Sequence, residues 1–244
     1  MSVPELAPAQ NVSEKLAVCQ LFINSFGKRT VYTLLNFVSL FVPDAPQACD
    51  YELTLYDQAG IKLGTEVVTV QPFGALAVRL DEVFNFSLPE LGLLSATIYP
   101  RNEQAISHLG DLKPYFYAMY HDEDMRSMAI IHPQSTVLTY RPVQTRFRSS
   151  LVVRTDTVEG IEIFQMNPVP EECKASISVV SMHGTRLVSS DDLIPGLGSR
   201  RVYWRTAKFR DHEFIALASD SMTAGNAKPL MFQHSANGFT AAHS

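Results

Sequence analysis

The sequence predicts an all-β protein built from two tandem, diverged β-sandwich modules that arose by internal duplication. Short runs rich in β-forming residues follow one another at spacings of roughly 8–12 residues, with Gly and Pro turn signals between them. Amphipathic helical periodicity is confined to two short stretches, 13–21 and 81–86. A common pattern of residues also recurs in the same order in both halves, which is the signature of a repeat.

The repeat is anchored on two cysteines. Cys49 opens the segment CDYELTLYDQAGIKL, and Cys173 opens CKASISVVSMHGTRL. Aligned without a gap, the two segments match Gly60 with Gly184 at a predicted hairpin turn. Strand alternation then places one apolar set inward in each half: Tyr51, Leu53 and Leu55, and Ala175, Ile177 and Val179. Because a one-residue slip would reverse the faces, this agreement indicates two similarly built interiors.

Further anchors follow in order if loops have been shortened. Ala96 aligns with Ala216, Lys113–Pro114 with Lys228–Pro229, and His132 with His243. Within one strand, Val78 aligns with Val202, but Leu76 aligns with Arg200 and breaks the apolar pattern.

These anchors predict three segments. Residues 1–20 are expected to form a flexible arm, 21–138 the first sandwich and 139–244 the second, with the boundary in the proline-containing stretch 133–142. In layout the modules resemble immunoglobulin-type or carbohydrate-binding sandwiches. The resemblance is at the level of the fold, and no residue motif accompanies it.

Composition excludes several classes of protein. The 244 residues are 46% apolar and 18% charged, as in a globular chain, and the net charge of −5 gives no overall attraction to nucleic acid. The apolar runs are shorter than the roughly 20 residues of a membrane-spanning helix. The N-terminal sequence carries no secretory signal pattern, and three cysteines are few for a disulfide scaffold, so we expect a cytoplasmic location.

Charge differs between the halves. Residues 1–138 hold 8 Lys and Arg against 15 Asp and Glu, whereas residues 139–244 hold 12 against 10. This polarity favours head-to-tail association of copies.

Histidines are the first candidate site residues. His132 and His243 fall at equivalent strand ends, which suggests either matched ligand-binding residues or histidines that bond neighbouring carbonyls. A zinc site needs three or four ligands, and each half offers one, so neither a metal nor a cofactor is predicted. An alternative hypothesis is a metal-dependent enzyme that uses His121 and His132. Against it, the acidic run 122–124 lacks calcium-loop spacing and is typical of a solvated turn.

Two surface patches complete the candidates. Arg200, Arg201, Tyr203 and Arg205 predict an interaction patch for an acidic protein surface; nucleic acid is disfavoured because no recognition motif is present. Tyr117 and Tyr120 belong to an aromatic run suited to stacking a sugar or another small ligand.

The sequence therefore favours a non-enzymatic binding or assembly protein with no catalytic residues, which uses sandwich edges and loops to contact a protein partner or another copy of itself. A carbohydrate- or small-ligand-binding module is the alternative, beside the His121 and His132 enzyme.

Overall fold

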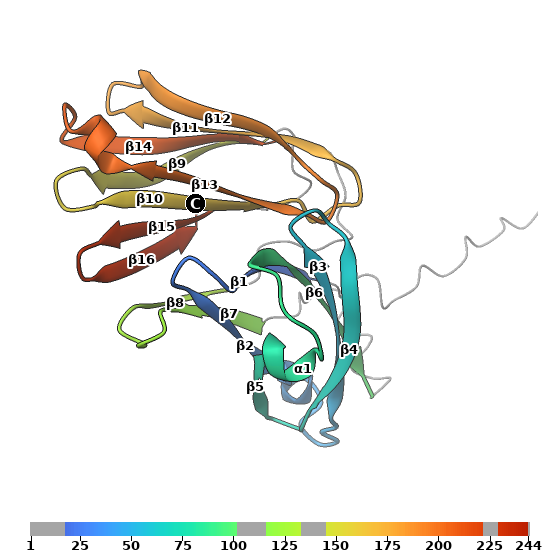
Figure 1. Cartoon of the computed structure of the whole chain (residues 1–244). Coiled ribbons are helices and arrows are strands. Elements are labelled where there is room, and N and C mark those ends of the chain that lie inside the picture. The colour runs from blue at the N-terminus through green and yellow to red at the C-terminus, as the bar shows by residue number, and fades with distance from the viewer. Residues whose placement is uncertain (1–17, 102–115, 133–144, 222–228, 244) are drawn as a thin grey trace, which may run out of the picture.

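The computed structural model describes residues 18–101, 116–132, 145–221 and 229–243, and these form four antiparallel sheets of four strands, paired into two sandwiches (Figure 1). The all-β prediction is confirmed. The predicted boundary at residue 138 lies outside the described residues. Strand β1 begins at Val18, so residues 18–20, which were expected in the flexible arm, belong to a sheet.

Both sandwiches use one strand order. In the first, one sheet runs β1 (Val18–Ile23), β6 (Leu91–Pro100), β3 (Cys49–Asp57), β4 (Lys62–Val70), and the other runs β5 (Ala75–Arg79), β2 (Arg29–Leu35), β7 (Phe116–His121), β8 (Met128–Ile131). In the second, the sheets run β9 (Thr145–Arg154), β14 (Phe214–Ser221), β11 (Cys173–Ser181), β12 (Arg186–Ile194), and β13 (Ser199–Arg205), β10 (Gly160–Met166), β15 (Leu230–Ser235), β16 (Gly238–His243).

Helical structure is limited to single turns among the described residues. Helix α1 (Leu80–Val83) overlaps the predicted turn at 81–86, and 3-10 turns cover Phe37–Leu40 and Thr206–Phe209. The other predicted helical stretch, 13–21, is wrong where it is described, because Val18–Leu21 lie in β1 with every side chain buried. No described helix has the length and apolar character needed to cross a membrane.

Matching details show how similar the two halves are. The β3–β4 ladder is interrupted between Leu55 and Tyr56, and the β11–β12 ladder is interrupted at the equivalent place, between Val179 and Val180. This is what the repeat hypothesis predicts. The duplication itself stays a prediction.

A buried asparagine fixes the end of the second strand in each sandwich. The Nδ2 of Asn36 donates to the carbonyls of Gln47, Val70 and Gln71, at 2.8–3.2 Å. Asn167 does the same for Glu171, Ile194 and Pro195, at 2.7–3.2 Å. Because these carbonyls would otherwise be buried without donors, each asparagine ties the end of a strand to the loops beside it.

Ladder register corrects one of the sequence anchors. Leu53 on β3 pairs with Ala96, and its counterpart Ile177 pairs with Ser219. Ala96 is therefore equivalent to Ser219, and its predicted match with Ala216 is wrong, because the small residues that align by sequence lie at different ladder positions. The match of His132 with His243 agrees with the β8 and β16 ladders.

The cysteine-anchored stretches line different interiors, as predicted. Tyr51, Leu53 and Leu55 belong to the core of the first sandwich, whereas Ile177 and Val179 belong to that of the second. Cys19, Cys49 and Cys173 are buried free thiols, and burial raises the pKa of Cys19 to about 12. They pack as small apolar residues.

The first interior, however, does not close by itself. Its core continues into four residues that point outward from the β10 and β15 strands of the second sandwich, namely Phe164, Met166, Leu230 and Phe232. We call the side of a sandwich between its first and last strands (β1 and β8, or β9 and β16) its open side. We call the outward face of the sheet that contains its second strand (β2 or β10) its outer face. The open side of the first sandwich rests on the outer face of the second.

At this junction, side chains form hydrogen bonds with main-chain groups on the free edge of β1. The hydroxyls of Tyr32 and Tyr120 both donate to the carbonyl of Leu21, at 2.8 and 2.9 Å. The hydroxyl of Thr30 accepts from the Ile23 amide and donates to the Ile23 carbonyl. With its main-chain groups already bonded, this stretch of edge is unsuited to pairing with a foreign strand.

Two further contacts join the sandwiches. The turn at Gly60 lies so close to the turn at Gly196 that a Cβ on Gly60 would stand 1.9 Å from the Gly196 carbonyl oxygen. Beside it, the Ser199 amide donates to the Gln58 carbonyl at 3.1 Å. Strand β8 also lies against β16, where the Phe239 amide donates to the Ser127 hydroxyl.

Candidate functional site

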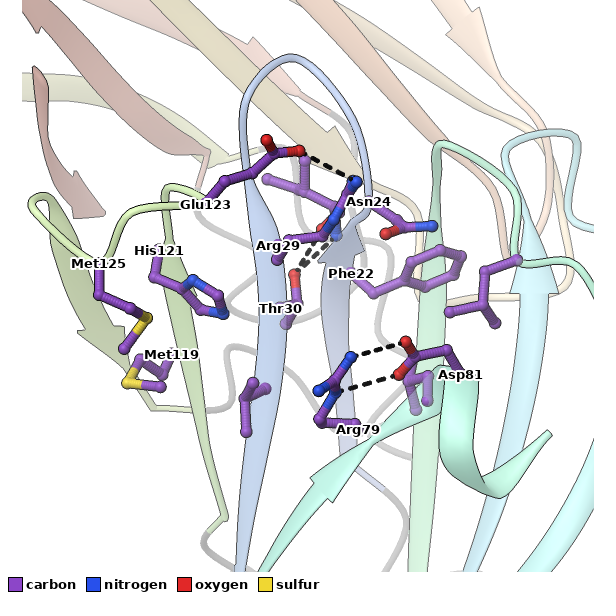
Figure 2. A pocket seen from close by; sticks show the side chains of 14 residues that line it. Phe22, Asn24, Arg29, Thr30, Arg79, Asp81, Met119, His121, Glu123 and Met125 are labelled. Atoms are coloured by element: carbon purple, nitrogen blue, oxygen red, sulfur yellow. Dashed lines mark hydrogen bonds and ion pairs between the residues drawn. The ribbon is translucent and has the colours of Figure 1, made fainter.

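A hollow of about 500 Å³ opens at the edge of the outer face of the first sandwich, next to Phe22, Ile23 and Asn24 at the end of β1 (Figure 2). Strands β2, β5 and β7 meet there, since Val31 pairs with both Arg79 and Met119. Alternation along these strands sends Arg29, Arg79 and His121 outward into the hollow together with Met119. The β7–β8 turn adds Glu123 and Met125, and helix α1 adds Asp81.

Arginine–carboxylate pairs form the polar wall of the hollow. Arg79 binds Asp81 through Nη2 at 2.9 Å and Nε at 3.3 Å, and Arg29 reaches Glu123 at 3.3 Å. The hydrogen bonds from Arg79 lower the pKa of the Asp81 carboxyl. Arg79 Nε also lies 3.4 Å from Glu82 Oε1. Each guanidinium has five N–H donors and these contacts use only some of them, so both can donate to a further carboxylate or other anion.

Exposed apolar side chains continue this surface across β7 and β8. Met119 pairs with Ile130, and His121 pairs with Met128, so these residues share one face. Ile130 is 61% exposed, and Tyr117, Met125 and Met128 are also exposed. The outer face of the first sandwich is thus apolar, with a basic and acidic rim at one end.

Of the histidines that the sequence singled out, the structure places His121 at the hollow. His121, which was assigned to an alternative enzyme, lines the hollow. His132 is exposed directly after β8, and its carbonyl accepts from Gln20 Nε2 at 2.9 Å. His243 ends β16, paired with Leu230, and its side chain lies outside the described residues, so the predicted pair stays untested. Within the described ranges, no three His, Cys, Asp or Glu side chains cluster as a metal site would require.

The predicted aromatic patch is wrong for one of its two residues. Tyr117 points to the outer face and is 39% exposed. Tyr120 is fully buried, because alternation turns it into the sandwich, where its ring meets Phe232 edge-on at 5.7 Å. A stacking platform built from both tyrosines is therefore excluded.

The predicted basic patch is also divided. Tyr203 and Arg205 are exposed, but Arg200 is buried inside the second sandwich. There Arg200 pairs across the ladder with Gln165 and donates to its side-chain oxygen at 2.7 Å and to the Ala175 carbonyl at 3.1 Å. In the first sandwich the equivalent cross-strand pair is Leu34 and Leu76. The inward pattern is therefore kept, with a polar pair in place of an apolar one.

The replacement of an apolar cross-strand pair by Gln165 and Arg200 leads to a prediction about stability. We expect Gln165→Leu alone to lower the free energy of unfolding by about 1–3 kcal/mol, because the buried Arg200 guanidinium loses an acceptor. The double variant Gln165→Leu/Arg200→Leu reproduces the apolar pair of the first sandwich and should recover most of that loss. Urea denaturation of the two variants and the wild type measures the difference. A double variant less stable than the single one would contradict the interpretation.

Arg201, the remaining patch residue, belongs to a buried ionic cluster between the sandwiches. Lys28 Nζ lies 2.5 Å from Glu162 Oε2, and both side chains are 1% exposed. Arg201 Nε binds the other Glu162 oxygen, and His234 Nε2 lies 2.8 Å from Oε2. Arg201 also stacks on Phe26, 3.7 Å from the ring centroid.

Electrostatics favours the ionised cluster. Burial raises the pKa of the Glu162 carboxyl, but hydrogen bonds from His234, Lys28 and Arg201 outweigh it and lower the pKa to about 2. Burial lowers the pKa of Lys28. Sequence reasoning missed this cluster. The available signal was Glu162 itself, a carboxylate in the otherwise apolar run GIEIFQM, every residue of which is buried.

Comparisons with known proteins assign no family. No family model matches the chain. No curated protein matches it either.

Solved structures show remote likeness. A β-glucuronidase from glycoside hydrolase family 2 is 11% identical over 93% of this chain and 23% of its own, with a TM-score of 0.20. A Bacteroides uniformis β-glucuronidase is 9% identical over 93% and 25%, with a TM-score of 0.18. A Parabacteroides distasonis protein described as secreted is 9% identical over 100% and 83%, with a TM-score of 0.22. The chain spans about a quarter of the length of the two glucuronidases. With TM-scores below 0.5, the likeness carries no argument about function.

Proposed function

We propose that the protein is a non-catalytic binding and assembly module whose contact surface is the outer face of the first sandwich. One observation carries the proposal. On the second sandwich, the apolar part of the outer face around Phe164 and Phe232 is covered by a protein surface, whereas on the first sandwich the apolar part around Met128 and Ile130 is exposed. A partly aromatic, Met-rich patch with an arginine rim is typical of protein contact surfaces.

The expected partner is a protein segment with aliphatic side chains and one carboxylate. The aliphatic groups would cover Met119, Met128 and Ile130, and the carboxylate would bind Arg29 or Arg79. A sugar platform is less well supported, because Tyr117 is the one exposed aromatic residue on β7 as described.

A matched pair of variants tests this proposal. Ile130 on β8 and Val67 on β4 are each 61% exposed. The probe is a set of fluorescent peptides, each with one glutamate flanked by leucines and valines. We expect Ile130→Asp to weaken peptide binding about tenfold or more, through lost apolar contact and added negative charge, and Val67→Asp to leave it unchanged. Fluorescence anisotropy measures both. Equal effects of the two variants, or no binding by the wild type, would refute the proposal.

A further inference from the structure

The two outer faces correspond residue by residue. Because Asn36 and Asn167 hold the same place, Val31 on β2 is equivalent to Glu162 on β10. The ladders then make Met119 equivalent to Phe232, and His121 equivalent to His234. Across the next ladder, Met128 is equivalent to Phe239. Phe232, on the second sandwich, is buried in the core of the first sandwich, which it completes. In the first sandwich, Met119 and His121 are half-buried and line the hollow, and Met128 is exposed.

The open side of the second sandwich is the surface expected to dock on the exposed outer face of the first. Where the first sandwich seats its open side on Phe164 and Phe232, the second has between β9 and β16 a small apolar cavity of about 10 Å³, lined by Leu151, Met231 and Ala242 among others. Within the described residues, each sandwich therefore has one outer face and one open side, and the chain joins the open side of the first to the outer face of the second.

The turn contact has open counterparts as well. Gly60 touches Gly196, but its equivalent Gly184 has nothing within 4 Å of an added Cβ. Met182, in that turn, is exposed, and so is Phe73, in the turn equivalent to 195–198. Phe73 and Leu197 share the same rare positive φ, 55° and 57°. The two unpaired turns thus have the shapes of the two paired ones.

Charged residues also stand at equivalent places in the two sandwiches. Lys28, in the β1–β2 turn, forms an ion pair with the carboxylate of Glu162. The equivalent residue in the β9–β10 turn is Glu159, which is exposed. A docked β9–β10 turn would bring Glu159 to the hollow that contains Arg29, Arg79 and His121, where Glu123 and Asp81 already pair with the two arginines. The carboxylate would then stand on the turn, and it would bind N–H donors of Arg29 and Arg79 that Glu123 and Asp81 leave free.

We infer that a second copy of this chain occupies the outer face of the first sandwich, contributing the open side of its second sandwich and placing Glu159 beside Arg29 and Arg79. The inference rests on the proposed function and names its partner. The contact repeats the one inside each chain, so it joins two different surfaces. Such heterologous contacts form open chains, or rings if the rotation closes.

Two variants that each block one surface provide the test. Ile130→Asp blocks the outer face, and Glu159→Lys blocks the open side; Glu66→Lys, the same charge change at an exposed position on β4, is the control. In sedimentation velocity, the wild type and Glu66→Lys should form species larger than dimers that grow with concentration. Each blocked variant should associate about tenfold more weakly or worse. An equimolar mixture of the two blocked variants should form a dimer and stop there, because each supplies one intact surface.

Other outcomes separate this inference from the proposed function. A wild type that stays monomeric, while peptides still bind in an Ile130-dependent manner, would overturn the second copy as partner and keep the binding face. A Glu159→Lys variant that dimerises as well as the wild type would show a symmetric face-to-face contact, with the same consequence. If the wild type showed neither peptide binding nor association, the proposed function itself would be wrong.

Discussion

Replacing Glu162 by glutamine should lower the free energy of unfolding by about 3–5 kcal/mol, the usual cost of removing one member of a buried ion pair. The Glu162 and Lys28 side chains are each 1% exposed and join the two sandwiches. Glutamine keeps the shape but leaves the Lys28 ammonium buried without an opposing charge. Urea denaturation followed by circular dichroism measures the loss.

Two controls make the result specific. Glu123→Gln removes the partner of Arg29, but that pair is exposed, so its loss should cost at most about 1 kcal/mol. The double variant Lys28→Met/Glu162→Leu removes both charges and should be more stable than Glu162→Gln. If Glu162→Gln proved no more harmful than Glu123→Gln, the cluster would not hold the sandwiches together.

The free energy of unfolding at acidic pH should also depend on the Glu162 carboxylate. Its pKa is about 2 in the folded protein against an ordinary 4.5, so the unfolded chain binds its proton first. The stabilising contribution of Glu162 is complete above about pH 4.5 and is lost as the pH falls toward 2. The wild type should lose more stability across this window than Glu162→Gln. Equal pH profiles would contradict the assignment.

The second large effect is expected at Phe232. Phe232→Ala should lower the free energy of unfolding by about 3–5 kcal/mol, the usual range for a fully buried phenylalanine. Its ring packs edge-on against Tyr120 and Phe164, each at 5.7 Å. Because Phe232 belongs to the second sandwich but completes the first core, the cavity opens at the junction.

The position of the cavity predicts an unequal response. Trp204 is the single tryptophan and lies in the second core, whereas Phe232 belongs to the first. In Phe232→Ala, the first sandwich should unfold at lower urea than the second, so circular dichroism should change before Trp204 fluorescence does. Phe214→Ala, at an exposed phenylalanine, is the control and should keep the two transitions together. Coincident transitions in Phe232→Ala would argue against this junction.

Much of the strand architecture follows from local pattern. Alternation identified Tyr51, Leu53 and Leu55 as inward residues, and their counterparts in β11 behave in the same way. Turn chemistry identified Gly60 and Gly184, both of which adopt a positive φ. These features depend on neighbours within a few residues, so a single sequence carries them.

The register between strands that are far apart in the sequence was harder to predict. The match of Ala96 with Ala216 failed because loop lengths differ and small residues resemble one another at any offset. Arg200 was taken for a surface residue because charge normally indicates exposure, yet Gln165, 35 residues away in sequence, makes its burial tolerable. Tyr120 was assigned to a ligand surface, although its parity with Phe116 places it in the core.

By itself, then, the sequence determined two sandwiches of like design, since the side-chain period of a strand decides which residues face inward. The tertiary structure decided how the sandwiches meet: it gave the second an outer face that the first covers, left the equivalent face of the first exposed, and brought Lys28 to Glu162. The physical reason is that a packed junction depends on shape and charge over residues far apart in the chain, and no local periodicity records which surfaces will meet.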